Sequence, residues 1–109
     1  MASYAAEPQQ VAEIRRLALD PSKVRLTRTA DYDLLGRHLK KDDVCQAIVK
    51  WIDAGERVKP VTLRGADSGA TAYEMKPRIG EFLFYVKVTL RELGQSNETM
   101  LVISAHLDH

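Results

Sequence analysis

The chain has 109 residues, of which 45% are hydrophobic and 28% charged, and its formal net charge is +1. This length fits one domain, residues 1–109, in which we expect residues 1–8 to be flexible. No apolar run approaches the roughly 20 residues of a membrane helix, the N-terminus lacks the pattern of a secretory signal, and a single cysteine with three scattered histidines suggests neither a disulfide nor a zinc site. We therefore expect a cytoplasmic protein that needs no metal or cofactor.

Three helices are predicted in the first half of the chain. Apolar residues at helical spacing predict a helix over residues 9–19. Residues 24–28 read as an extended segment, after which Thr29 is expected to cap a brief helix that ends at Gly36. The clearest helix covers residues 42–54. Its wide apolar stripe consists of Val44, Cys45, Ile48, Val49 and Ile52, so Cys45 is expected to be a core residue.

From residue 58 onward the hydrophobic period changes to two, which predicts strands. The expected strands are residues 58–63, 71–75, 81–90 and 100–106. Helices followed by a meander of strands indicate an α+β fold. We expect N-terminal helices packed on one face of a mostly antiparallel sheet of about four strands.

The expected central strand, residues 81–90, has two different faces. One face carries Phe82, Phe84, Val86, Val88 and Leu90, and the other carries Leu83, Tyr85, Lys87 and Thr89. In the last strand, Leu101, Ile103 and Ala105 are expected on one face and Ser104 and His106 on the other. A polar face of this kind can bind a phosphodiester, although the same alternation is typical of a half-exposed strand without any catalytic role.

Several cationic and aromatic residues could converge on this polar face. Residues 57–92 carry seven Lys and Arg against four Asp and Glu. The candidates are Lys59, Lys76, Arg78, Tyr85 and Lys87, with His106 joining them if the last strand pairs beside the central one. Such a set could cleave RNA. A base removes the proton of a 2′-hydroxyl, cations offset the charge on the phosphorane, and an acid protonates the leaving 5′-oxygen. Surface lysines and arginines are, however, more often simply solvated.

From about residue 24 to its end, the chain resembles the MqsR (motility quorum-sensing regulator) family of toxins. The matching segments are Val24-Arg-x-Thr-Arg28, Val44-Cys45, Val58-Lys59-x-x-Thr62, Lys76-Pro77-Arg78 and Tyr85-x-Lys87-Val-Thr89, which follow the order of the family. Each segment is short, and none is diagnostic alone. The resemblance implies a RelE-like fold and an mRNA-cleaving toxin of a type II toxin–antitoxin system.

The resemblance also implies roles for individual residues. The catalytic lysine of the family falls on Lys59, its catalytic tyrosine on Tyr85, and the basic residue beside the proline on Lys76, with Arg78 just after it. A functional glutamine of the family has no counterpart here. Tyr73 or Glu74 could take its place, and Tyr73 therefore joins Lys76, Arg78 and Lys87 among the RNA-binding candidates.

The sequence suggests two alternative functions. The first is a metal-independent endoribonuclease toxin that cleaves single-stranded mRNA with Lys59, Tyr85 and His106, and is neutralised by a cognate antitoxin protein. The second is a non-catalytic protein-binding module on the same scaffold, or a toxin relative with a different target. The near-neutral net charge and the missing glutamine favour the second function.

Overall fold

The computed structural model describes residues 5–65 and 69–108. In chain order the elements are α1 (Pro8–Ala18), the 3₁₀ turn η1 (Pro21–Lys23), β1 (Val24–Leu26), α2 (Arg28–Leu35), α3 (Lys41–Asp53), β2 (Lys59–Thr62), β3 (Thr71–Met75), β4 (Arg78–Ile79), β5 (Phe82–Arg91) and β6 (Thr99–Leu107). Within the described ranges, no helix has the length and apolar character needed to cross a membrane.

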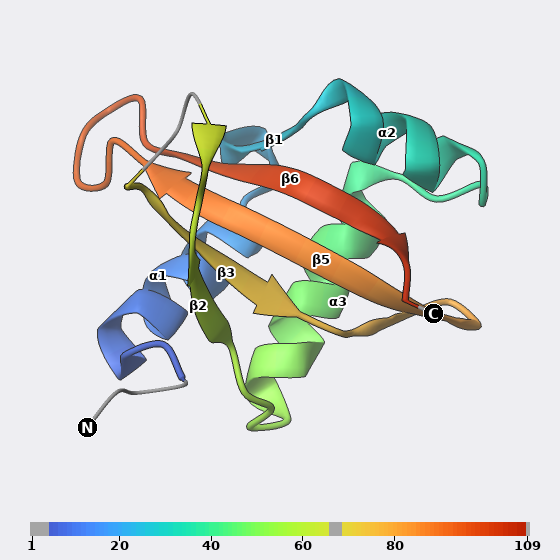
Figure 1. Ribbon diagram of the computed structural model, residues 1–109, viewed down its shortest axis with the longest axis horizontal. Coiled ribbons are helices and arrows are strands. Elements are labelled where there is room, and N and C mark those ends of the chain that lie inside the picture. The colour runs from blue at the N-terminus through green and yellow to red at the C-terminus, as the bar shows by residue number, and fades with distance from the viewer. Residues whose placement is uncertain (1–4, 66–68, 109) are drawn as a thin grey trace.

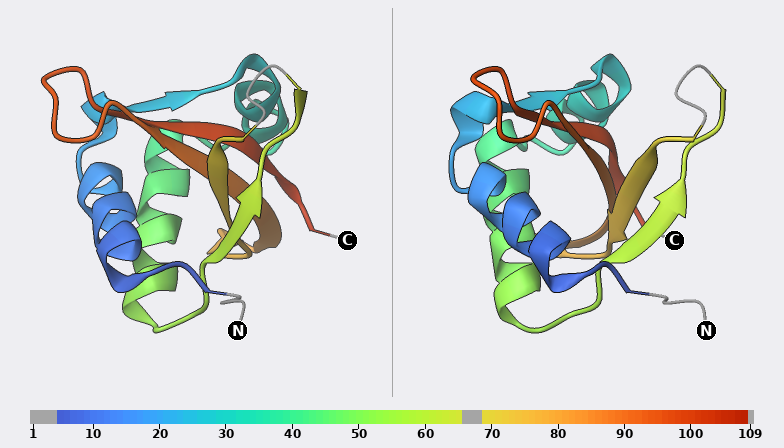
Figure 2. Two further views of the ribbon diagram at one scale, coloured as in Figure 1. Left: turned by 60° about the vertical axis from the view of Figure 1, so that its left-hand side comes forward. Right: turned by 90° about the vertical axis from the view of Figure 1, so that its left-hand side faces the viewer.

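The strands form one twisted mixed sheet. Their order is β1-β6-β5-β3-β2, and β4 pairs with β5 off this path. β1 runs parallel to β6, whereas the other pairs are antiparallel. α1 and α3 lie side by side behind one face of the sheet, and α2 lies along β6 (Figures 1 and 2). The opposite face carries no helix of the described chain, and we call it the open face.

The expected α+β class is confirmed, but the expected number of strands is wrong. The sheet has six strands rather than about four. β1 corresponds to the extended segment expected at residues 24–28, and β4 occupies two residues before Gly80, whose φ of 61° permits the tight turn into β5. Strands of two or three residues are too short to show an alternation of apolar and polar residues. β1 and β4 are therefore recognised only by their hydrogen-bonded pairing with β6 and β5.

A backbone hydrogen bond joins the N-terminal segment to the residue that precedes β2. The Ala6 amide donates a hydrogen bond of 2.7 Å to the Val58 carbonyl, and α1 already begins at Pro8. The expected flexibility of residues 1–8 stays a prediction, and residues 1–4 lie outside the described residues.

The second helix begins earlier than the sequence predicts. Thr27, rather than Thr29, is its cap, and Thr27 Oγ1 accepts a hydrogen bond of 3.1 Å from the Ala30 amide. The same hydroxyl donates to the Ile103 carbonyl at 2.8 Å. Tertiary pairing with β6 thus explains why the first of the two threonines caps the helix.

The hydrophobic core fills the space between the sheet and the helices α1 and α3. Phe84, Val86 and Val88 of β5 are 0% exposed, as is Ile48 of α3. The expected core face of β5 is therefore confirmed at these positions. Cys45 is also buried in this core, and burial raises the pKa of its thiol to about 11, as expected for a packing residue.

A β-bulge in β6 changes which residues face the core. The register between β5 and β6 shifts at Ile103, which has no partner in β5. The buried residues of β6 are Met100, Val102 and Ala105. The expectation that Leu101, Ile103 and Ala105 share one face is therefore wrong, because the extra residue reverses the alternation and leaves Leu101 on the open face.

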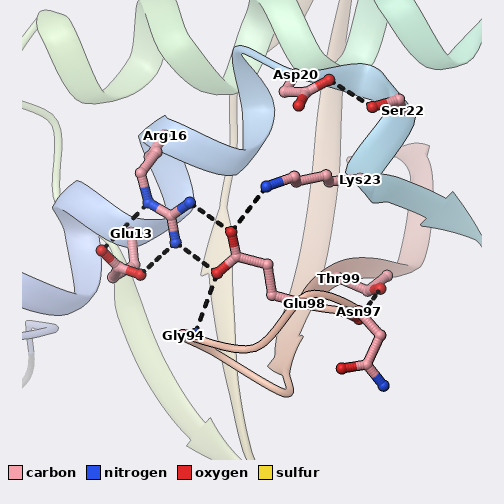
Figure 3. A network of polar contacts seen from close by, with 9 residues as sticks. All are labelled: Glu13, Arg16, Asp20, Ser22, Lys23, Gly94, Asn97, Glu98 and Thr99. Carbon is pink, nitrogen blue, oxygen red and sulfur yellow. Dashed lines mark hydrogen bonds and ion pairs between the residues drawn. The ribbon is translucent and has the colours of Figure 1, made fainter.

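A buried carboxylate connects α1, η1 and the loop between β5 and β6 (Figure 3). Glu98 is 8% exposed and accepts hydrogen bonds from Arg16 at 2.6 and 2.8 Å, from Lys23 at 3.0 Å and from the Gly94 amide at 3.2 Å. Arg16 also pairs with Glu13 at 2.6 Å. The hydrogen bonds from Arg16, followed by those from Lys23 and Gly94, hold the pKa of Glu98 well below its ordinary value.

We expect Glu98→Gln to lower the melting temperature at pH 7 by several degrees, because a neutral amide leaves two cations without their shared carboxylate. The folded-state pKa is depressed, so the stabilisation is complete above the ordinary pKa of 4.5 and is lost as the pH falls below it. Thermal melts followed by circular dichroism should show the difference between wild type and variant shrinking from pH 4.5 downward. Glu13→Gln, which removes an outer partner of Arg16, is the control with the smaller expected effect. Equal melting temperatures of wild type and Glu98→Gln at pH 7 contradict the stabilising role.

Candidate functional site

A row of polar residues crosses the open face from the edge strand toward β6. Lys59 of β2 lies opposite Glu74 of β3, and Glu74 lies opposite Lys87 of β5. Lys87 in turn lies opposite Ser104 of β6. Residues directly opposite one another in antiparallel strands point to the same side of the sheet. Glu74 therefore stands between two lysines, and no ion pair joins it to either of them within the described chain.

An aromatic pair lies beside this row. Tyr85 and His106 are register partners, and their rings stack with centroids 5.1 Å apart and an interplanar angle of 21°. His106 Nδ1 lies 3.0 Å from the Leu107 carbonyl oxygen, which can only accept a hydrogen bond. The proton of the neutral ring is thus assigned to Nδ1, which leaves Nε2 available for a ligand. The expected approach of His106 to Tyr85 is confirmed.

The tyrosine hydroxyl is directed at the carboxylate of the polar row. Tyr85 donates a hydrogen bond to Glu74 Oε2. Burial, then this hydrogen bond and the negative charge of Glu74, raise the pKa of Tyr85 well above its ordinary value. The hydroxyl therefore keeps its proton at neutral pH, and Tyr85 acts here as a hydrogen-bond donor.

A hollow of about 490 Å³ brings three of the expected site residues together, and we call it the tyrosine hollow. Its lining consists of Trp51, Glu56, Arg57, Lys59, Glu74, Met75, Lys76, Tyr85 and Asp108. Lys76 Nζ lies 3.8 Å from Asp108 Oδ2. The lining holds three cations and three carboxylates, so the hollow is polar without a large net charge.

A second hollow of about 540 Å³, the lysine hollow, lies next to the first because both are lined by Glu74. It is lined by Thr27, Val61, Thr62, Leu63, Arg64, Glu74, Lys87, Leu101 and Ile103. Lys87 and Arg64 supply positive charge and Glu74 a carboxylate, while the remaining lining is apolar or hydroxyl-bearing. Together the two hollows follow the open face across β2, β3, β5 and β6.

Comparison with protein-family models, with curated proteins and with solved structures finds no match for this chain. Over residues 5–65 and 69–108, no group of three or more His, Cys, Asp and Glu side chains is placed to hold a metal ion. The two hollows offer lysine ammonium groups, a tyrosine hydroxyl and carboxylates, and the His106 imidazole stacks on that tyrosine. These are groups that can bind phosphates and move protons.

Two of the expected site residues lie elsewhere. Tyr73 is 5% exposed and belongs to the core, because in β3 it points to the face opposite Glu74. Arg78 lines a separate small pocket with residues of α3, and its Nη1 donates to the Glu81 carbonyl at 3.4 Å. Neither residue lines the tyrosine hollow or the lysine hollow. The expectation that they bind RNA with Tyr85 is therefore corrected.

Glu74 is the central residue to which sequence reasoning assigned no role of its own. The resemblance suggests Glu74 only as a replacement for the family glutamine. The strand containing it reads Thr71-Ala-Tyr-Glu-Met75, in which three of the five side chains are apolar or aromatic, so hydropathy does not reveal which face Glu74 occupies. The register between β3 and β5 shows that Glu74 lies on the open face, because it places Glu74 opposite Lys87.

Proposed function

We propose that this protein is a metal-independent endoribonuclease that cleaves single-stranded mRNA, and that it is a toxin of the MqsR type with a RelE-like fold. The observation that carries the proposal is the tyrosine hollow, in which Lys59, Lys76 and Tyr85 lie together while His106 stacks on Tyr85. A cognate antitoxin would neutralise the toxin in the cytoplasm.

The chemistry of the hollow suits transfer of a phosphodiester to its own 2′-hydroxyl. Lys59 and Lys76 would bind the scissile phosphate and offset the negative charge that grows on the phosphorane. Tyr85 keeps its proton because its pKa is raised, so it would act in the hollow as a hydrogen-bond donor and not as a base. His106 would protonate the leaving 5′-oxygen through Nε2.

The shape of the open face suits an unpaired strand of RNA. The adjoining hollows extend across four strands, with Lys87 and Arg64 in the second of them. A neighbouring phosphate could be bound there while the first hollow holds the scissile one. Nucleic-acid bases stack on aromatic side chains in single-stranded complexes, and the paired rings of Tyr85 and His106 offer such a platform.

We expect expression of the wild-type protein without its antitoxin to arrest bacterial growth, and Tyr85→Phe to relieve that arrest. Phenylalanine retains the stacked ring and loses only the hydroxyl that contacts Glu74. Growth curves after induction, with immunoblots for equal protein levels, measure the effect. Tyr32→Phe is the matched control, because Tyr32 is 77% exposed on α2 and lines neither hollow. The proposal fails if wild type and Tyr85→Phe are equally toxic.

A non-catalytic protein-binding module remains the second candidate, and the apolar part of the open face favours it. Val61, Leu101 and Ile103 line the lysine hollow, and β2 ends the strand order on that side of the sheet. An edge strand can accept a further strand from a partner protein. If this is the function, purified protein leaves RNA intact while it still binds the product of a neighbouring antitoxin gene.

A further inference from the structure

Glu74 occupies a position that the proposed cleavage leaves without a role. It lines both hollows, lies opposite Lys59 and Lys87, and accepts the hydrogen bond of Tyr85 through Oε2. Its second oxygen, Oε1, has no hydrogen-bond or ion-pair partner in the part of the chain that the structure describes. The carboxylate of Glu74, a residue of intermediate exposure, therefore stands between the cations that would bind two successive phosphates.

We infer that Glu74 is the general base that removes the proton of the attacking 2′-hydroxyl, an inference that rests on the proposed function. A base is required, because a neutral hydroxyl is a poor nucleophile toward a phosphodiester. A carboxylate is an acceptor without a proton of its own, whereas lysine ammonium groups offer only donors.

The other candidates for the base are less suitable. Tyr85 would need to be a phenolate, and its raised pKa opposes this. His106 lies on β6, on the opposite side of β5 from Lys59 of β2. It lines a different hollow with Asp33 of α2 and with Arg37, which follows that helix. A carboxylate and an imidazole on two sides of one tyrosine form an acid–base pair in which Glu74 takes a proton and His106 gives one.

The step balances without any further reactant. The 2′-hydroxyl proton passes to Glu74, and the 2′-oxygen forms a bond to phosphorus. The bond from phosphorus to the 5′-oxygen breaks, and protonated His106 transfers its Nε2 proton to that oxygen. The products are a 2′,3′-cyclic phosphate and a 5′-hydroxyl, after which Glu74 loses its proton to water and His106 gains one.

Charged neighbours surround Glu74, and the Tyr85 hydroxyl orients it. The titratable groups that share its hollows are Lys59, Lys76, Lys87, Tyr85, Arg57, Arg64, Glu56 and Asp108. Five of these eight are cations, which would attract the phosphates of RNA toward the carboxylate. The hydrogen bond from Tyr85 holds Oε2 of the Glu74 carboxylate. Because the carboxylate is planar and rigid, the same contact also sets the direction of Oε1.

The experiment measures kcat/KM against pH for a single-stranded RNA oligonucleotide in EDTA. We expect Glu74→Gln to lower kcat/KM by at least 100-fold and to remove the limb in which the rate rises with pH. Glu74→Asp, which keeps a carboxylate, should retain that limb at a reduced rate. Glu81→Gln, which changes an exposed carboxylate that lines neither hollow, should behave as wild type. Unchanged melting temperatures establish that the variants are folded.

A substrate with sulfur in place of the leaving 5′-oxygen separates the base from the acid, because a thiolate leaves without protonation. It should restore most of the rate of His106→Ala and little of the rate of Glu74→Gln. Rescue of Glu74→Gln, retention of its rising limb, or a loss below threefold overturns the assignment of Glu74 alone. Intact RNA after incubation with wild type overturns the proposed function, and the inference with it.

Discussion

Lys59→Ala should lower kcat/KM for RNA cleavage by about 100- to 1000-fold, the usual loss when one preorganised group that stabilises transition-state charge is removed. Lys59 is exposed at the start of β2, lines the tyrosine hollow and lies opposite Glu74. It forms no ion pair within the described residues. The free energy of unfolding should therefore change by only about 0.5 kcal/mol. Initial rates on a fluorescent RNA oligonucleotide, with urea denaturation of the same samples, measure both quantities.

Lys50→Ala is the matched control for this experiment. Lys50 is an exposed lysine on α3 that lines neither of the two hollows on the open face. Its replacement removes the same charge from the protein and should leave cleavage unchanged. Equal losses in the two variants would indicate that total charge, rather than the tyrosine hollow, determines the rate.

Phe84→Ala should reduce the free energy of unfolding by about 3–5 kcal/mol, because it removes a large side chain that is 0% exposed and leaves a cavity. Phe84 precedes Tyr85 in β5 and points to the opposite face, into the core beneath the candidate site. A loss of this size is a large fraction of the stability of a small domain. Urea denaturation monitored by circular dichroism measures it.

Leu83→Ala is the control on the other side of the same strand. Leu83 is 42% exposed, so its truncation should cost less than about 1 kcal/mol. Similar costs for Leu83→Ala and Phe84→Ala would contradict the assignment of the two faces of β5.

The part of the fold that could be predicted from the sequence is the part set by local periodicity. β5 alternates between Phe84, Val86 and Val88 on one side and Tyr85 and Lys87 on the other over enough residues to fix both faces. The apolar stripe of α3 is equally long, so its extent was predicted to within one residue at each end.

The features that could not be predicted depend on pairing between distant segments. The bulge at Ile103 exists only in the register of β6 with β5, and no local pattern marks it. Thr27 caps α2 in place of Thr29 because its hydroxyl also reaches the Ile103 carbonyl of β6. The parallel pairing of β1 with β6 likewise joins residues that are about 75 positions apart in the chain.

The candidate site was predicted only in part, because some of its residues are brought together by pairing between distant strands. Lys59, Lys76 and Tyr85 line one hollow, as their order around the strands suggested, and His106 joins Tyr85 through the pairing of β6. Tyr73 was expected to bind RNA but lies in the core, and the adjacent buried residues Ala72 and Tyr73 leave β3 without a clear alternation. That error also concealed Glu74 as the partner of Tyr85.

The most direct test is incubation of purified protein with single-stranded RNA in EDTA, followed by analysis of the new ends. We predict cleavage by wild type with 2′,3′-cyclic phosphate and 5′-hydroxyl ends, and at least a 100-fold lower rate for Lys59→Ala purified in parallel. Intact RNA, or equal cleavage by wild type and Lys59→Ala, would contradict the proposal that the tyrosine hollow cleaves RNA.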